Sequence, residues 1–158
     1  MCWFCKNFHT GNDFNPVEMN IKCGIFGNAS LDVYINSAPD NKTALLNMEL
    51  PPFKAIKSFE INYCPVCGEH LSNANTVFEK YEDGTCGYCN NPFEMTRNPY
   101  FSMKIDCGDI TYETGALLSF LTYDTGVRMV MSFISDSKKF SKSIDVSYCP
   151  ICGNKFNG

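Results

Sequence analysis

One short phrase occurs twice in this chain and constrains its fold more than any other feature. The phrase Tyr-Cys-Pro-x-Cys-Gly stands at residues 63–68 and again at 148–153. A further pair of cysteines, also separated by two residues, precedes each copy: Cys2 and Cys5 the first, Cys86 and Cys89 the second. Regular repetition of this kind predicts two copies of one structural unit.

The rest of the sequence supports a duplication. Further matches follow the same order along the chain: Met19, Ile21, Cys23 and Gly24 match Met103, Ile105, Cys107 and Gly108, and Lys57 and Ser58 match Lys142 and Ser143. We therefore predict two tandem modules, at residues 1–72 and 84–158, with a connector at 73–83. Because Val77, Phe78 and Tyr81 would share one face of a helical turn or two, the connector is predicted to hold a short helix.

Inside each module apolar residues alternate with polar ones, a pattern typical of half-buried strands. Strands are predicted around these alternating series: Val17 to Cys23, Leu31 to Ile35, Phe59 to Tyr63, Phe101 to Cys107, Val127 to Phe133, and Ile144 to Tyr148. Segment 41–50 would also suit a helix capped by Asn41, but its counterpart in the second copy is strand-like, so we predict a strand. The predicted fold class is mainly β, with an antiparallel meander of about four strands in each module.

The cysteines are predicted to bind metal. No stretch of about 20 apolar residues would cross a bilayer, and no basic segment followed by an apolar one opens the chain, so we expect a cytoplasmic protein with no membrane partner. In that reducing compartment, ten cysteines favour metal sites over disulfides. Structural zinc takes four ligands in a tetrahedron, so four thiolate pairs would hold two structural zinc ions. Proline and glycine in the repeated phrase suit a tight metal-binding turn, because one fixes a backbone angle and the other tolerates a positive one.

Two arrangements of the pairs would complete these sites. In the self-closing arrangement, each module binds its own ion: Cys2, Cys5, Cys64 and Cys67 hold one, and Cys86, Cys89, Cys149 and Cys152 hold the other. In the crossed arrangement, the two central pairs share an ion across a gap typical of zinc sites, and the two outer pairs share the second. We favour the self-closing arrangement because an ancestral module had to complete its own site before it was copied. It would also staple the first and last strands of a small module.

Other residues near the pairs are predicted not to be ligands. Cys23 and Cys107 would be extra ligands or reactive thiols, but each ends an alternating apolar series, which favours a buried core cysteine. His9 and His70 follow cysteine pairs closely, yet neither position is a histidine in the other copy, where Phe93 and Lys155 stand. The predicted metal ligands are therefore the eight paired cysteines alone.

The charge balance bears on the partner. The formal net charge is -4, whereas domains that follow nucleic-acid backbones usually carry a basic excess. Lysines do gather before the last strand of each copy, near Phe53 and Phe140: Lys54 and Lys57 in the first, Lys138, Lys139 and Lys142 in the second. Such clusters would contact phosphates, but a solvated loop is the more common role. A protein partner is favoured over a nucleic acid.

The repeated phrase resembles the zinc-ribbon and rubredoxin-like zinc-knuckle families, in which a Cys-Pro-x-Cys-Gly turn pairs with an upstream Cys-x-x-Cys. The resemblance rests on the eight paired cysteines and on Gly68 and Gly153, and it implies zinc ligation and a β-rich ribbon. The long segment between the pairs departs from a simple ribbon and must contain most of each sheet. Tyr-Cys-Pro-x-Cys-Gly endings also look like those of many small proteins of bacteriophages and mobile elements. This likeness implies an inhibitor of a host factor or defence nuclease, such as an anti-CRISPR protein, in the host cytoplasm.

These observations favour a non-catalytic binding protein over an enzyme. Zinc sites closed by four cysteines leave no open position for water or substrate, and the sequence has no phosphate-cradling glycine loop and no His-x-Glu of zinc deaminases. Two alternatives stay open. One is a nucleic-acid-binding zinc ribbon, supported by the lysines, and the other is a thiol-disulfide redox protein, whose reactive pairs usually open a helix in a βαβ setting.

Overall fold

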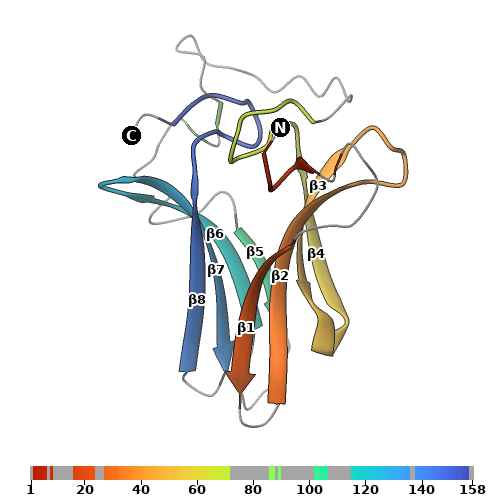
Figure 1. Ribbon diagram of the computed structural model, residues 1–158, viewed down its shortest axis with the longest axis vertical. Helices are drawn as coiled ribbons and strands as arrows, with labels where there is room; N and C mark the ends of the chain where they lie inside the picture. Colours follow the sequence, from red (N-terminus) through yellow and green to blue (C-terminus); the bar gives the residue numbers. More distant parts are fainter. Residues whose placement is uncertain are drawn as a thin grey trace.

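Two antiparallel sheets make up the part of the chain that the structure describes (Figure 1). The computed structural model describes residues 2–6, 8, 16–23, 27–71, 86–87, 89, 102–106, 115–135 and 138–156. The first sheet contains β1 (Val17–Cys23), β2 (Gly27–Ser37), β3 (Ala44–Leu50) and β4 (Ala55–Ile61). The second contains β5 (Ser102–Asp106), β6 (Gly115–Tyr123), β7 (Gly126–Ser135) and β8 (Lys138–Val146). Within each sheet the strands follow one another in sequence order, each antiparallel to the last.

The predicted mainly β class is confirmed, and the residues that the structure describes contain almost no helix. Segment 41–50, which also suited a helix, contributes β3, and the 3-10 turn η1 (Pro51–Phe53) follows it. The predicted connector helix at 73–83 lies outside the described residues. No helix among the described residues is long and apolar enough to cross a membrane.

Alternation along the strands gives each sheet one apolar face. In β3, Ala44, Leu46, Met48 and Leu50 are buried. In β7, Val127, Met129, Met131 and Phe133 are buried in the same way. Successive side chains of a strand point to opposite faces, so these residues line one side of each sheet.

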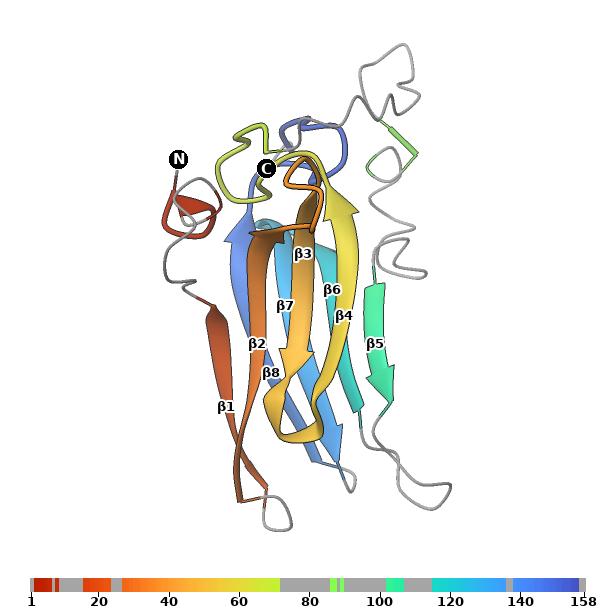
Figure 2. The same cartoon turned by 90° about the vertical axis from the view of Figure 1, so that its right-hand side faces the viewer.

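The two apolar faces pack against each other and form a single core (Figure 2). The largest fully buried side chains come from both sheets: Leu31, Leu46, Met48, Leu50 and Ile61 from the first, and Leu118, Phe120, Met129, Met131 and Phe133 from the second. At the margins β4 lies beside β5, and β1 lies against β7 and β8. The last strand of each sheet therefore borders the first strand of the other.

A lysine links the sheets at the margin between β1 and β8. The ammonium group of Lys142 donates a hydrogen bond to the carbonyl oxygen of Glu18 (2.6 Å). An edge strand exposes unpaired backbone groups, and a charged side chain that caps one of them blocks pairing with another chain. Lys142 thus connects β8 to the neighbouring edge strand of the other sheet.

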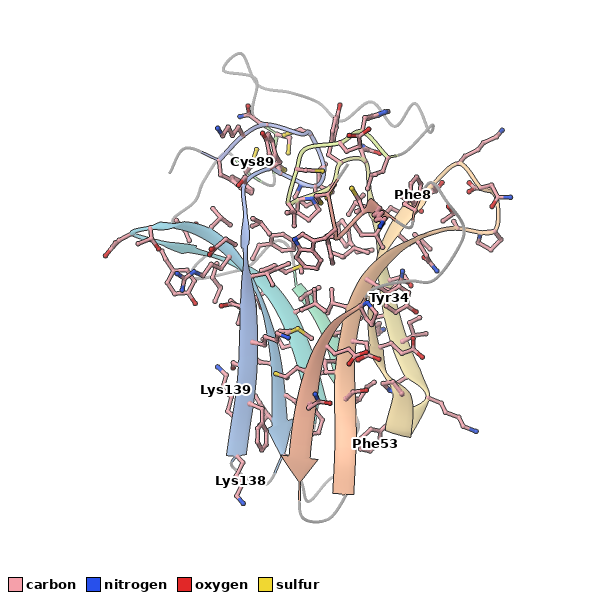
Figure 3. All side chains as sticks on the ribbon, viewed as in Figure 1. Phe8, Tyr34, Phe53, Cys89, Lys138 and Lys139 are labelled. Atoms are coloured by element: carbon pink, nitrogen blue, oxygen red, sulfur yellow. The ribbon has the colours of Figure 1, made fainter. Side chains whose placement is uncertain are left out.

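The segments that carry the eight paired cysteines gather at one end of the sandwich. Cys2 and Cys5 lie there beside the turn that follows β4, and Cys86 and Cys89 lie beside the turn that follows β8 (Figure 1). Figure 3 places Cys89 at this end and Lys138 and Lys139 at the opposite one. The turns of the repeated phrase are called the first closing turn (residues 63–68) and the second closing turn (148–153).

Candidate metal centres

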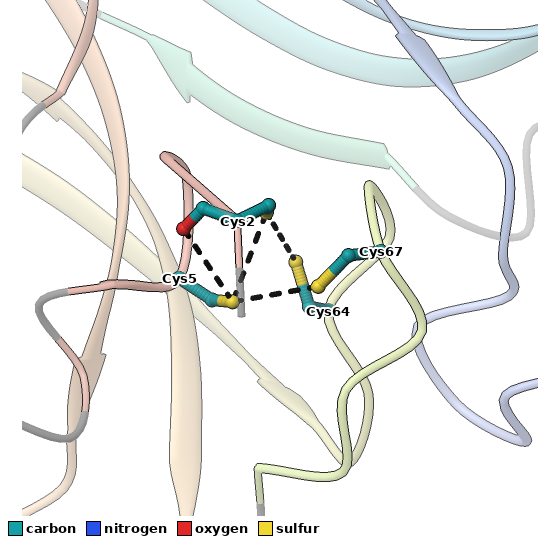
Figure 4. Close-up of side chains that lie close together, drawn as sticks. All are labelled: Cys2, Cys5, Cys64 and Cys67. Carbon is teal, nitrogen blue, oxygen red and sulfur yellow. Dashed lines mark hydrogen bonds between the residues drawn. The ribbon is translucent and has the colours of Figure 1, made fainter.

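Four cysteines from the two ends of the first half converge in one cluster, the first cysteine cluster (Figure 4). The sulfur of Cys2 lies 3.8 Å from that of Cys5 and 3.7 Å from that of Cys64. The sulfur of Cys5 lies 3.6 Å from that of Cys67. A disulfide requires about 2.05 Å between sulfurs, so these are four separate thiols.

Four cysteines of the second half form the second cysteine cluster. The sulfur of Cys86 lies 3.8 Å from that of Cys89 and 3.9 Å from that of Cys149, and the sulfur of Cys89 lies 3.5 Å from that of Cys152. Within each cluster all four sulfurs lie within 4.8 Å of one another. A zinc ion with four sulfurs at about 2.3 Å makes a tetrahedron with edges of about 3.8 Å, and the observed separations are close to this length.

The grouping is that of the self-closing arrangement. Cys64 and Cys67 lie with Cys2 and Cys5, and not with Cys86 as the crossed arrangement requires. The fold explains this result, because β4 carries the first closing turn to the end of the sandwich where the chain begins. Each cluster joins residues that precede its sheet to residues that follow it.

Each closing turn has the backbone geometry that its sequence predicts. The amide of Gly68 donates to the carbonyl of Cys64 (2.8 Å), and the amide of Gly153 donates to the carbonyl of Cys149 (2.9 Å). These glycines have φ angles of 75° and 74°, in the left-handed region that glycine adopts without strain. The turn reverses the chain and brings both of its sulfurs to one side.

Backbone hydrogen bonds to sulfur accompany the turns. The pKa of Cys64 is raised by burial, while hydrogen bonds with the backbone of Val66 and Cys67 act in the opposite direction. Burial also acts to raise the pKa of Cys67, but hydrogen bonds with the backbone of Glu69 and with neighbouring sulfurs outweigh it and lower the value. Amides aimed at a sulfur favour the thiolate, which is the form that binds metal.

Burial and neighbouring thiols raise the pKa of three further cysteines, Cys5, Cys89 and Cys149. Burial raises the pKa of Cys5 to about 11. In the second cluster, hydrogen bonds with Cys86 and Cys89 raise the pKa of Cys149 strongly, and burial adds to the effect. The hydrogen bond with Cys149 lowers the pKa of Cys89, yet the contacts with Cys86 and Cys152 and burial bring it to about 12. Four such thiols close together are suited to a divalent cation, which would replace their protons.

The other candidate ligands stand apart from both clusters or cannot be placed. His70 is exposed, with its ring 4.9 Å from the ring of Tyr63, and belongs to neither cluster. Cys23 ends β1, but its side chain, like Cys107 and His9, lies outside the described residues. The described lysines of the two predicted groups are all exposed: Lys54, Lys57, Lys138, Lys139 and Lys142.

The contact between the two closing turns was not predicted from the sequence. The carbonyl of Pro150 accepts from the amides of Asn62 and Tyr63 (2.8 and 2.9 Å). Reciprocally, the carbonyl of Pro65 accepts from the amides of Ser147 and Tyr148 (2.9 and 3.0 Å). The two centres therefore meet through the backbone of their own metal-binding turns.

Comparison of the chain with known protein families, with curated proteins and with solved structures gave no match. The resemblance to zinc ribbons and zinc knuckles thus rests on the residues of the two clusters. Those clusters fit zinc-binding units.

Proposed function

We propose that the chain is a non-catalytic binding protein made of two tandem zinc-stapled β modules, residues 1–72 and 84–158. Each cysteine cluster would hold one structural zinc ion: Cys2, Cys5, Cys64 and Cys67 the first, and Cys86, Cys89, Cys149 and Cys152 the second. The observation that carries the proposal is the presence of two sets of four thiols, each with sulfur separations near the edge of a zinc–thiolate tetrahedron.

A structural role for the ions follows from the donor set. Four sulfurs fill a tetrahedral zinc site and leave no position for a water molecule or a substrate. Sulfur-only tetrahedral sites suit zinc and also iron, but zinc has no redox chemistry and serves only to hold its ligands. The ion would join the segment before each sheet to the turn after it, at the end of the sandwich where backbone pairing stops.

The partner is proposed to be a protein. Sheets that bury one face in a shared core leave their outer faces for contact, and two modules would offer two related surfaces to one target. Inhibition of a host factor or defence nuclease, in the manner of an anti-CRISPR protein, is the specific role that we propose for such contact. It rests on the likeness of the repeated phrase to endings found in phage and mobile-element proteins.

Metal analysis of the intact chain tests the zinc proposal. Native mass spectrometry of the purified protein is expected to show two zinc ions per chain, and a strong chelator is expected to remove both and to lower the temperature of the thermal unfolding transition. Iron in place of zinc would overturn the choice of metal. Oxidation of the paired cysteines to disulfides in the protein as isolated from the cytoplasm would favour a thiol-disulfide protein instead.

A binding experiment tests the partner class. The zinc-loaded chain is expected to retain no DNA or RNA at low salt, where phosphate contacts are strongest. Pull-down from the native host, with the chelated protein as control, is expected to recover one protein only when zinc is present. Retention of nucleic acid that falls steeply with salt would support the nucleic-acid-binding alternative.

A further inference from the structure

We infer that the two closing turns position each other, so that the two cysteine clusters bind metal as a coupled pair. An ion in either cluster would raise the affinity of the other for its own ion. The inference rests on the proposed zinc sites, and it adds a function for the residues between the paired cysteines. Tyr63 and Tyr148 become positioning residues. Tyr63, which precedes Cys64 of the first cluster, acts on the second cluster, and Tyr148, which precedes Cys149 of the second, acts on the first.

Reciprocal backbone hydrogen bonds join the turns inside the metal-binding loops themselves. Pro65 directly follows the ligand Cys64, and its carbonyl accepts from two amides of the other half. Pro150 directly follows Cys149 and does the same in the opposite direction. Each proline contributes its rigid ring to its own loop and its carbonyl to the opposite one. A change in the conformation of one loop therefore moves an acceptor on which the other loop depends.

The tyrosines and glycines of the repeated phrase make a second reciprocal contact. A Cβ atom added to Gly68 would lie 2.8 Å from Cδ1 of Tyr148, and one added to Gly153 would lie 2.7 Å from Cδ1 of Tyr63. Each ring thus lies directly on the glycine of the opposite turn. The glycine is needed both for its positive φ and for this close approach. Since each tyrosine directly precedes a cysteine of its own cluster, its backbone belongs to one closing turn and its ring contacts the glycine of the other.

The contact gives a physical route for coupling. Metal binding fixes a closing turn in the conformation that holds two of its four ligands. A fixed turn holds its proline carbonyl and its glycine in the positions that the opposite turn contacts, so the opposite turn is ordered before its own ion binds. The conformational entropy lost when the second ion binds is therefore smaller than for the first, and this difference gives positive cooperativity. Coupling of this kind typically changes affinity by about 5- to 150-fold.

Zinc titration against a competing chelator, followed by native mass spectrometry, tests the inference. Two variants each disable one cluster through its opening pair and leave both closing turns intact: Cys2→Ser with Cys5→Ser, and Cys86→Ser with Cys89→Ser. They give the two single-site binding constants. The overall two-ion constant of the unaltered chain is expected to exceed the product of these constants by about 5- to 150-fold.

Substitution of the contact itself assigns the coupling to the turns. Tyr148→Ala, measured in the same three cysteine backgrounds, removes one ring contact and keeps the backbone hydrogen bonds, so it is expected to reduce the excess below that of the unaltered chain. Tyr148→Phe keeps the ring on Gly68 and is expected to retain the excess. Tyr123→Ala is the matched control, because Tyr123 is exposed and packs on Arg128 in the β6–β7 hairpin.

The outcomes separate the inference from the proposed function. Two bound ions with no excess in the unaltered chain would overturn the coupling and leave the zinc sites standing. An excess in Tyr148→Ala as large as in the unaltered chain would show that the ring on Gly68 does not contribute to it, which overturns the role of Tyr148 as a positioning residue. A chain that retains no metal in any background would overturn the zinc proposal itself. Circular dichroism of each variant at saturating zinc verifies that the strands are retained.

Discussion

The two cysteine clusters share one backbone plan but differ in how well their surroundings shield them. In the first cluster Cys2 and Cys67 are only partly buried, whereas in the second only Cys89 is. At the variable position of the turn, Val66 is half-buried and Ile151 is 1% exposed. The turn is therefore set by backbone hydrogen bonds that both copies make, and the side chains around it determine how much water each site meets.

Loss of a ligand is expected to have the largest effect and to be larger in the better shielded cluster. Cys67→Ser and Cys152→Ser should each reduce the zinc content from two ions to one and lower the free energy of unfolding by several kcal/mol, since metal binding is coupled to folding. Cys152 is 4% exposed, so its replacement leaves a buried hydroxyl and costs about 1–3 kcal/mol more. Metal analysis and thermal unfolding measure both effects. His70→Gln, outside both clusters, is expected to keep two ions, and loss of one there would contradict the assigned ligand set.

Acidification is expected to release the second ion before the first. Zinc competes with protons for the thiolates, so affinity falls as pH falls, and it falls sooner where raised pKa values make the thiols hold protons more tightly. Each cluster contains two thiols with a raised pKa, Cys5 and Cys64 in the first and Cys89 and Cys149 in the second, but the first also contains Cys67, whose pKa is lowered. Metal content measured against pH in the two single-cluster variants compares them. Release of both ions at the same pH would contradict the difference.

The stability of the metal-free chain is expected to fall as pH rises, the opposite of the trend expected for zinc binding. A pKa raised in the folded state means that folding favours the neutral thiol, so this contribution to stability is fully present below the unfolded pKa and is lost as pH rises through the folded one. For Cys5 and Cys89 the folded values are about 11 and about 12. Stability of the chelated protein should therefore decline above roughly pH 9 and continue to fall up to about pH 12. Urea unfolding across this range, with and without zinc, measures the two opposite trends.

The repeated cysteines and the alternating strands could be read from the sequence because both are local patterns. Seven of the strands overlap predicted segments, although β4 and β8 share only their last three residues with them, and β6 (Gly115–Tyr123) was not located individually. Its residues do not alternate strictly: Leu118 and Phe120 face the core, while Leu117 and Leu121, on the other face, are also partly buried. A strand shielded on both faces loses the two-residue period on which the prediction depended.

No pattern in the sequence predicts the contact between the closing turns, although the residues that make it belong to the repeated phrase. Tyr63 and Tyr148 repeat in the sequence, but repetition alone does not say that each ring lies on the opposite glycine. The acceptors of the cross-turn hydrogen bonds are backbone carbonyls, which every residue carries. Likewise, alternating strands predict that each sheet has an apolar face, but they do not predict whether the two faces pack against each other. These features depend on how the two halves meet, and that information is not local.

Asn62 and Ser147 occupy matching places before the two closing turns and offer a test of their side chains. The buried Asn62 amide donates from Nδ2 to the carbonyl of Ile151 (3.1 Å), whereas Ser147 is exposed. Asn62→Ala would leave that carbonyl without this donor and is expected to cost about 1–3 kcal/mol of unfolding free energy. Ser147→Ala should change it by less than about 0.5 kcal/mol. Chemical denaturation of the zinc-loaded proteins compares the pair, and equal costs would mean that the Asn62 side chain adds nothing to the shared backbone bonds.

The variable position of the phrase gives the smallest and most direct test of unequal shielding. Ile151→Val removes one methylene from a fully buried side chain, and the resulting cavity is expected to cost about 0.5–1.5 kcal/mol. Val66→Ile adds a methylene at a half-buried position, where the extra group reaches solvent and stability should change by less than about 0.5 kcal/mol. The two variants exchange the side chains between turns whose backbones are alike. If shielding by the side chains distinguishes the clusters, the second should lose its ion more readily in Ile151→Val, while the first stays unchanged in Val66→Ile. Equal shifts of zinc affinity in Ile151→Val and Val66→Ile would instead mean that the two clusters differ through their cysteine ligands and not through the side chains that shield them.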